Sequence, residues 1–312
     1  MPHDHRFRFG VQLSHTNDGA SWAALVRKVE DLGFDCVYIP DHFGDQFGPI
    51  SALTAAADAT EHLRVGTLVF DNDYRHPVVP AKEIATLDIL SGGRVEFGLG
   101  AGWMTTDYQQ SGLAHDPAGV RIDRMEEAIT VYKGVFSGEA FDFAGEHYTI
   151  SGLRGAPRPV QTPHPPLLIG GGGKRVLSIA AREADIVSIN PNLKAGAIGI
   201  EVAADATADA TDRKVGWVRD AAGDRFDDIE LSALVFACIV TDDRQGMAEN
   251  MAPMFGITPD DVLEMPHTWI GSTDEIVDSL RAHRERWGFS HFVVQGGALE
   301  PIAPIVAALA GT

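Results

Sequence analysis

The amino-acid sequence predicts an α/β fold, and more specifically a (β/α)8 TIM barrel with an insertion near strand 5. Short apolar runs rich in β-branched residues alternate with longer segments whose apolar residues recur every three or four positions. The short runs are hydrophobic almost throughout, as in parallel strands that helices cover on both faces. Eight such runs in a chain of 312 residues fit a closed barrel better than an open doubly wound sheet.

Each expected strand is a short run of this kind. The eight strands are expected at 7–13, 36–39, 64–70, 94–99, 167–170, 186–189, 229–240 and 291–295. A Rossmann fold is the alternative, but its glycine fingerprint belongs directly after the first strand. Here Ser14, His15 and Thr16 follow that strand without a glycine cluster, which favours the barrel.

The helices between the strands are amphipathic and have recognisable ends. One is expected at 21–32, with Ser21 as its N-cap. Another is expected at 273–287, with Thr273 as its N-cap. Further helices are expected at 80–90, 121–136 and 176–184.

The chain 1–312 is expected to form a single domain, although two stretches interrupt the strand–helix repeat. The stretch 138–166 has the pattern of a hairpin followed by a proline-rich connector, and 256–270 is irregular. Both belong on loops, and in a barrel the loops after strands carry function.

Composition excludes several classes of protein. Apolar residues make up 45% of the chain, which is typical of a globular protein, and the formal net charge is −19. Such a charge repels nucleic-acid phosphates and anionic lipid, and no apolar run is long enough to span a bilayer. Only Cys36 and Cys238 are cysteines, both within expected strands. With no apolar leader at the N-terminus, we expect a cytoplasmic protein.

Asp41 and His42 come directly after the second expected strand, across Pro40. In a barrel this is the C-terminal end of a strand, where catalytic side chains project. An imidazole titrates near neutral pH and can act as an acid, a base or a hydrogen-bond donor. The alternative is an aspartate that caps a helix beside a packed histidine. The position in the barrel favours function.

Two glycine-rich turns follow other strands. Gly98, Gly100 and Gly102 stand at alternate positions, where missing side chains let the backbone approach a flat or anionic ligand. The same spacing also suits a tight barrel corner. Glycines 170–173 precede the expected helix at 176–184, and their amides at a helix N-terminus predict a phosphate site rather than a flexible connector. The cations Lys174 and Arg175 follow them.

The histidines show no metal-binding spacing, so no metal site is expected. Together, the strand-end pair and the two glycine turns resemble the bacterial luciferase-like superfamily, and most of all its branch that uses the deazaflavin coenzyme F420. The resemblance extends over nearly the whole chain. The segments that carry it are 66–77, 87–103, 121–127 and 166–173, of which 87–103 is highly specific.

The resemblance implies a (β/α)8 barrel and a role for each residue noted above. Asp41 and His42 are expected beside the coenzyme ring, with His42 hydrogen-bonding or donating a proton near the reacting centre. Thr67 and Leu68 lie where relatives carry a non-prolyl cis peptide against the ring face. The other expected coenzyme contacts are Gly100, Ala101 and Gly102 beside the ring or tail, and Gly171, Gly172, Gly173, Lys174 and Arg175 around the phosphate.

Trp103 departs from the sugar-phosphate dehydrogenase branch, which carries a glutamate directly after these glycines. An aromatic ring cannot exchange that proton, so a sugar phosphate is not the expected substrate. Trp103 is instead expected to line an apolar substrate pocket. F420 and FMN share a tricyclic ring and a ribityl phosphate, so one glycine-rich anion site serves either coenzyme.

The first hypothesis is therefore an F420-dependent oxidoreductase that transfers a hydride between the coenzyme and an unidentified small organic substrate. One alternative is an FMN-dependent luciferase-like monooxygenase. The other is a non-catalytic protein that binds flavin or deazaflavin. Relatives commonly dimerise, so a homodimer is the assembly that the resemblance implies.

Overall fold

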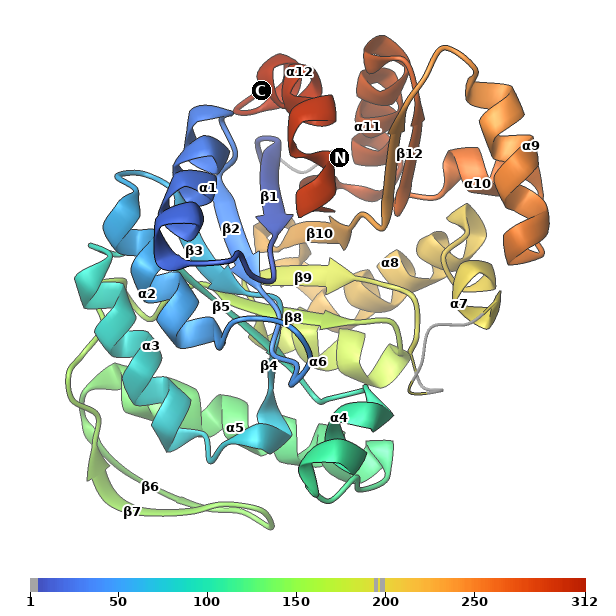
Figure 1. Ribbon diagram of the computed structural model, residues 1–312. Helices are drawn as coiled ribbons and strands as arrows, with labels where there is room; N and C mark the ends of the chain where they lie inside the picture. Colours follow the sequence, from blue (N-terminus) through green and yellow to red (C-terminus); the bar gives the residue numbers. More distant parts are fainter. Residues whose placement is uncertain (1–4, 194–195, 197–199) are drawn as a thin grey trace.

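The computed structural model describes residues 5–193, 196 and 200–312. At its centre lies a closed barrel of eight parallel strands, surrounded by helices (Figure 1). The barrel strands are β1 (Arg8–Gln12), β2 (Cys36–Ile39), β3 (Arg64–Thr67), β5 (Val95–Gly100), β8 (Leu167–Gly171), β9 (Ile186–Ile189), β10 (Glu230–Leu234) and β13 (Phe289–Gln295). The pairing of β3 with β5 closes the ring. The TIM barrel predicted from the sequence is confirmed.

Two of the expected strands are each divided in two. The run 64–70 breaks after β3 and resumes as β4 (Phe70–Asp71), which pairs with the end of β5. The run 229–240 leaves the barrel after β10. Its second half, β11 (Ala237–Val240), pairs with β12 (Thr268–Gly271), which lies mostly in the stretch expected to be irregular. The strand β12 is buried because Trp269 packs edge-on against the barrel residues Phe9 and Phe292.

The helices are α1 (Gly19–Asp31), α2 (Pro49–Ala59), α3 (Val78–Leu90), α4 (Thr105–Ser111), α5 (Ala118–Ser137), α6 (Lys174–Glu183), α7 (Ile200–Ala204), α8 (Ala208–Ala222), α9 (Arg244–Phe255), α10 (Pro259–Glu264), α11 (Thr273–Trp287) and α12 (Leu299–Leu309). Most of them cover the outside of the barrel, whereas α9 and α10 pack against each other and against β12 (Figure 1). Short 3-10 turns are η1 (Asn72–Tyr74), η2 (Gly223–Asp228) and η3 (Gly296–Ala298). Among the described helices, none combines the length and apolar composition that crossing a bilayer requires.

Both N-caps named from the sequence are wrong, Ser21 by three residues and Thr273 by one. Asp18 caps α1, and its carboxylate accepts the amide of Ser21 at 2.7 Å. Ser272 caps α11 in a capping box with Glu275, so Thr273 is the first helical residue. Several oxygen-bearing side chains precede each helix, and only the extended backbone of Asp18 and Ser272 identifies the cap.

The stretch 138–166 holds an antiparallel hairpin of β6 (Ala140–Ala144) and β7 (Thr149–Arg154). The carboxylate of Glu127 on α5 accepts the amides of Glu146, His147 and Tyr148 in the turn between these strands. This single side chain fastens the hairpin to the barrel's outer helix layer.

Charged side chains fill the N-terminal end of the barrel. Buried Glu96 pairs with Arg8 and with Arg64, whose Nε lies 2.6 Å from the carboxylate, and Arg8 also pairs with Glu230 at 2.7 Å. Burial alone would raise the pKa of Glu96, but the two guanidinium groups hold it well below its usual range. Because each of these four charged side chains has a partner of opposite charge, the network can stay buried. This end of a TIM barrel ordinarily contributes to stability, whereas catalysis takes place at the other end.

Three described histidines, His267, His283 and His291, are buried. Burial lowers the pKa of His283 from 6.5 to about 4. The unfolded chain therefore binds more protons than the folded chain between these values. The contribution of His283 to stability is complete above pH 6.5 and is lost as the pH falls toward 4.

We expect His283→Gln to weaken this acid sensitivity. Lowering the pH from 7.5 to 5.5 should cost the wild type about 1 kcal/mol more unfolding free energy than it costs the variant. Urea unfolding at both pH values measures the difference. His62→Gln, at an exposed histidine, is the control and should keep the wild-type pH dependence. Equal pH dependence in His283→Gln and wild type would contradict the assignment.

Candidate active site

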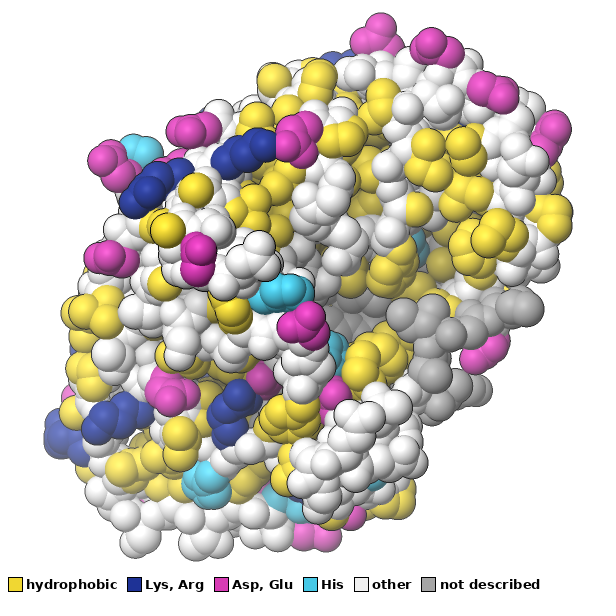
Figure 2. All heavy atoms as spheres, viewed as in Figure 1, with side chains coloured by type: hydrophobic (Ala, Val, Ile, Leu, Met, Phe, Trp, Pro, Cys, Tyr) yellow, Lys and Arg dark blue, Asp and Glu magenta, His cyan; other side chains and the backbone are white. Residues whose placement is uncertain are grey.

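The candidate site residues gather at one end of the barrel. Asp41 and His42 follow β2, Trp103 follows β5, and Gly172 and Gly173 follow β8. Because the strands are parallel, their carboxyl ends lie at the same mouth. The surface is hollowed near the centre of the space-filling view, with histidine and acidic side chains at its rim (Figure 2).

The carboxylate of Asp41 is occupied by protein donors. Arg75 Nη1 and Nη2 lie 2.5 and 2.9 Å from its two oxygens, and the amide of Asp71 donates to it at 3.2 Å. Asp41 is 4% exposed. This bidentate pair ties the end of β2 to the segment after β4, so in this structure Asp41 orders the mouth.

His42 forms a dyad with a residue that the sequence did not reveal. Its Nδ1 lies 2.6 Å from Oδ2 of Asp107 on α4, a buried carboxylate that also accepts the hydroxyl of Tyr74 at 3.0 Å. With Nδ1 bound to the carboxylate, Nε2 is the ring nitrogen that can serve a ligand. The Trp103 ring stands edge-to-face at 5.7 Å from the imidazole.

The glycine pattern at the end of β5 serves protein packing. A Cβ at Gly98 would lie 1.9 Å from the Thr67 carbonyl oxygen, and one at Gly100 would lie 2.6 Å from Val69. Gly102 has a φ of +75°, and a Cβ there would meet the hydroxyl of Tyr108. The sequence suggested space for a ligand at these positions, but the neighbouring strand and helix fill it.

Arg121 on α5 holds this turn in place. Its guanidinium donates to the carbonyl of Ala101 at 3.0 Å and to the carbonyl of Gly102. Ala101 and Gly102 therefore bond to the protein through their carbonyl groups. The turn leads directly into Trp103 and α4, so Arg121 also helps to position α4 and its residue Asp107.

The non-prolyl cis peptide joins Leu68 to Val69, one residue later than the resemblance implied. Thr67 is fully buried, and its hydroxyl donates to the Gly98 carbonyl at 2.8 Å and accepts the Gly98 amide at 3.0 Å. Thr67 therefore joins two strands, whereas Leu68 turns its carbonyl toward Gln12, which donates to it at 2.9 Å.

The turn after β8 ends in an uncapped helix. Gly173 is the N-cap of α6, and as a glycine it has no side chain that could accept a hydrogen bond from the first turn of this helix. A Cβ at Gly172 would lie 2.4 Å from the Asn192 amide nitrogen, so Gly172 is needed for packing. At Gly173 the nearest atom would be the side-chain nitrogen of Asn192 at 3.4 Å. The opening at Gly173 suits an anion.

The two cations beside this turn are exposed. Arg175 pairs with Asp123 on α5 and donates to the Gly119 carbonyl at 3.3 Å. It therefore points to the neighbouring helix, in contrast to the expected contact with a phosphate. Lys174 is the first residue of α6. The backbone amides are thus the main donors at this helix end.

A pair of acidic residues, Asp71 and Asp73, tethers α4 to the barrel. The hydroxyl of Tyr108 lies 3.1 Å from Asp71 and 3.0 Å from Asp73, and Arg124 pairs with Asp73 at 2.7 Å. Burial raises the pKa of Asp71 to about 7, and the nearby charge of Asp73 adds to the shift. Within the described part of the chain, no His, Cys, Asp and Glu side chains form a metal-binding group of three.

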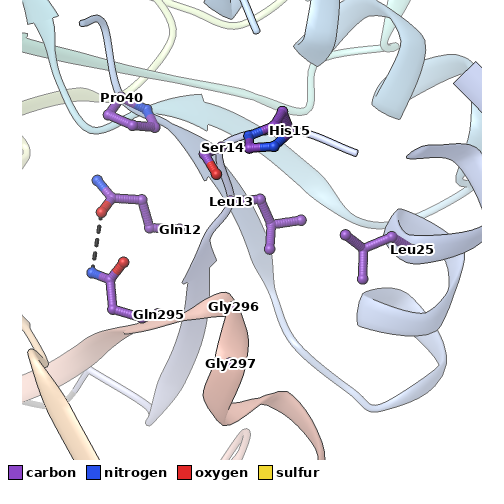
Figure 3. A pocket seen from close by; sticks show the side chains of 9 residues that line it. All are labelled: Gln12, Leu13, Ser14, His15, Leu25, Pro40, Gln295, Gly296 and Gly297. Carbon is purple, nitrogen blue, oxygen red and sulfur yellow. Dashed lines mark hydrogen bonds between the residues drawn. The ribbon is translucent and has the colours of Figure 1, made fainter. Parts of the chain in front are cut away.

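A cavity of about 440 Å³ opens at the ends of β1 and β13 (Figure 3). Gln12 and Gln295, the last residues of these strands, are register partners and line it. Gln295 Nε2 donates to Gln12 Oε1 at 3.1 Å. Neither residue was expected at the site from the sequence, although a polar residue at the end of an apolar barrel strand can indicate a functional position.

Residues 5–291 match the family of luciferase-like monooxygenases. The chain is 28% identical over 197 residues to the FMNH2-dependent dimethylsulfone monooxygenase of Pseudomonas putida, which covers 59% of this chain and 53% of that protein. It is 30% identical over 183 residues to the 5,10-methylenetetrahydromethanopterin reductase of Archaeoglobus fulgidus, with the same two coverages. The chain thus spans about half the length of these relatives.

The fold is similar to that of the coenzyme F420-dependent tetrahydromethanopterin reductase from Methanopyrus kandleri. The TM-score is 0.78 at 19% identity, and the alignment covers 97% of this chain and 98% of that one. At this identity the likeness concerns the fold.

The dyad predicts which nitrogen of His42 carries hydrogen in the neutral ring. In wild type the hydrogen should reside on Nδ1, because the buried Asp107 carboxylate accepts it. Asp107→Ala should shift the ring toward the Nε2–H tautomer, and two-bond proton–nitrogen correlation spectra of protein labelled at histidine measure the shift.

Tyr74→Phe is the matched control, since it removes another donor to the same carboxylate and leaves the dyad intact. The control should keep the wild-type tautomer. An Nε2–H ring in wild type, or an unchanged tautomer in Asp107→Ala, would rule out the dyad.

Proposed function

The chain belongs to the luciferase-like monooxygenase family, and we propose from this premise that it transfers a hydride between coenzyme F420 and a small organic substrate. Its relatives include an FMNH2-dependent monooxygenase and an F420-dependent dehydrogenase, which supports an activity in oxidoreduction. The observation that carries the finer proposal is that the uncapped glycine end of α6 and the dyad of His42 open on the same mouth.

The described residues fit a coenzyme that carries a phosphate. The amides of Gly171, Gly172, Gly173 and Lys174 would hold the phosphate, aided by the helix dipole. The fit rests on a glycine N-cap, which has no capping side chain, and on the room at Gly173, where a Cβ would come no closer than 3.4 Å to another side chain. When bound, the coenzyme supplies the ring carbon that gives or takes the hydride.

In this proposal the dyad moves the accompanying proton. A doubly protonated His42 ring would release its Nε2 proton to a substrate oxygen and keep Nδ1–H bound to the Asp107 carboxylate. In the opposite direction, neutral Nε2 accepts the proton of a substrate hydroxyl. Trp103 packs edge-to-face against the imidazole and so helps to hold the ring in place.

A second candidate, an FMN-dependent monooxygenase, is favoured by the similarity to the FMNH2-dependent dimethylsulfone monooxygenase. The phosphate site proposed above serves both coenzymes equally. The distinction must therefore come from the ring, and only a direct comparison of the two coenzymes decides it. Homodimer formation stays a prediction.

The test is retention of coenzyme by the purified protein. After incubation with F420 or FMN and gel filtration, we expect F420 to remain bound and FMN to be lost, as measured by absorbance. Retention of FMN alone would support the monooxygenase. Retention of F420 without redox change across a broad substrate panel would support a binding protein, and retention of neither would contradict both coenzyme proposals.

Two variants locate the phosphate. Gly173→Asp places a carboxylate where the anion should bind and should weaken F420 binding by at least about tenfold, or 1.4 kcal/mol. Gly173→Ala adds only a Cβ that meets the end of one side chain, and should bind nearly as wild type. Equal effects of the two substitutions would place the phosphate elsewhere.

A further inference from the structure

We infer that the cavity between β1 and β13 receives the substrate's polar group and selects a neutral hydrogen-bonding group over an anion. The inference rests on the proposed function, because it names the class of substrate for the same mouth. The cavity of about 440 Å³ is large enough for a small organic molecule.

The orientation of the Gln295 amide is set by a chain of hydrogen bonds. Gln12 Nε2 donates to the Leu68 carbonyl at 2.9 Å, which leaves Gln12 Oε1 as an acceptor. Gln295 Nε2 donates to that oxygen at 3.1 Å. The Gln295 oxygen takes no part in this hydrogen bond, which the dashed line in Figure 3 marks between the two amides. The free edge of Gln295 offers one carbonyl oxygen and one remaining N–H.

The rest of the wall is apolar or neutral. Leu13, Leu25 and Pro40 supply apolar surface, and Ser14 supplies a hydroxyl. Gly297 leaves open space, since a Cβ there would meet no atom within 4 Å. The wall thus combines apolar surface with a few neutral polar groups, as in pockets for small uncharged molecules.

The charges around the cavity disfavour an anion. Among the described residues that line it there is no lysine or arginine, and the titratable side chain is that of His15. His15 lies 3.6 Å from the carboxylate of Asp45, so this pair adds no net positive charge. A carboxylate or phosphate would lose hydration without gaining a cation, in a chain of net charge −19.

The cavity also lies on the correct side of the mouth for the proposed chemistry. Pro40 lines it and leads directly through Asp41 to His42. The Leu68 carbonyl, at the other end of the glutamine chain, belongs to the turn between β3 and β4. A neutral carbonyl or hydroxyl group anchored at Gln295 would therefore share this mouth with the proton-carrying histidine.

The experiment compares two probes of the same shape, cyclohexanecarboxamide and cyclohexanecarboxylate. Saturation-transfer NMR on the full chain, without coenzyme, measures their binding. Wild type should bind the amide about fivefold more tightly than the carboxylate, the value of one hydrogen bond. Gln295→Leu should lose that preference, and Gln295→Lys should reverse it by supplying a cation. Far-UV circular dichroism checks that each variant folds.

Ser14→Ala is the matched control, because it removes a different polar group from the same wall, and it should keep a preference for the amide. Tighter binding of the carboxylate by wild type, no binding of either probe, or an unchanged preference in Gln295→Leu would overturn the inference. Because no coenzyme is present, failure of F420 retention leaves this result standing, and failure here leaves the coenzyme proposal standing.

Discussion

The contact between Thr67 and Gly98 is the constraint on which the mouth of the barrel depends. A Cβ at position 98 would lie 1.9 Å from the carbonyl oxygen of Thr67, so only glycine fits there. The Thr67 hydroxyl bonds both the amide and the carbonyl of Gly98. This contact joins the ends of β3 and β5, the pair that closes the ring. It also sets the turn at Leu68 against Gln12.

The electrostatics of the mouth follow from how its arginines are used. Arg75, Arg121, Arg124 and Arg175 all bind protein carboxylates or carbonyls. The cations near the site therefore serve to order its loops. An anion at this end would therefore bind the backbone amides at the N-terminus of α6, with Lys174 as the cation beside them. A substrate at the Gln295 end must rely on neutral hydrogen bonds.

Sequence periodicity was enough to predict the barrel, because parallel strands covered on both faces leave long apolar runs. It could not divide the run 229–240, since both halves are apolar and only tertiary packing sends β11 out of the barrel. Asp41, His42 and the glycine turns were found because they directly follow strands. Asp107 was missed because its partner lies 65 positions away, and that distance closes only in the fold. Glycine spacing alone could not distinguish packing at Gly98 from ligand contact.

The most direct measurement of the central claim is a crystal structure of the protein with F420. The account predicts the coenzyme phosphate on the amides of Gly171, Gly172 and Gly173, and the ring within hydrogen-bonding distance of His42 Nε2. The cavity beside Gln295 should remain open for substrate. A phosphate bound through arginine side chains, or a ring that fills the Gln295 cavity away from His42, would contradict it.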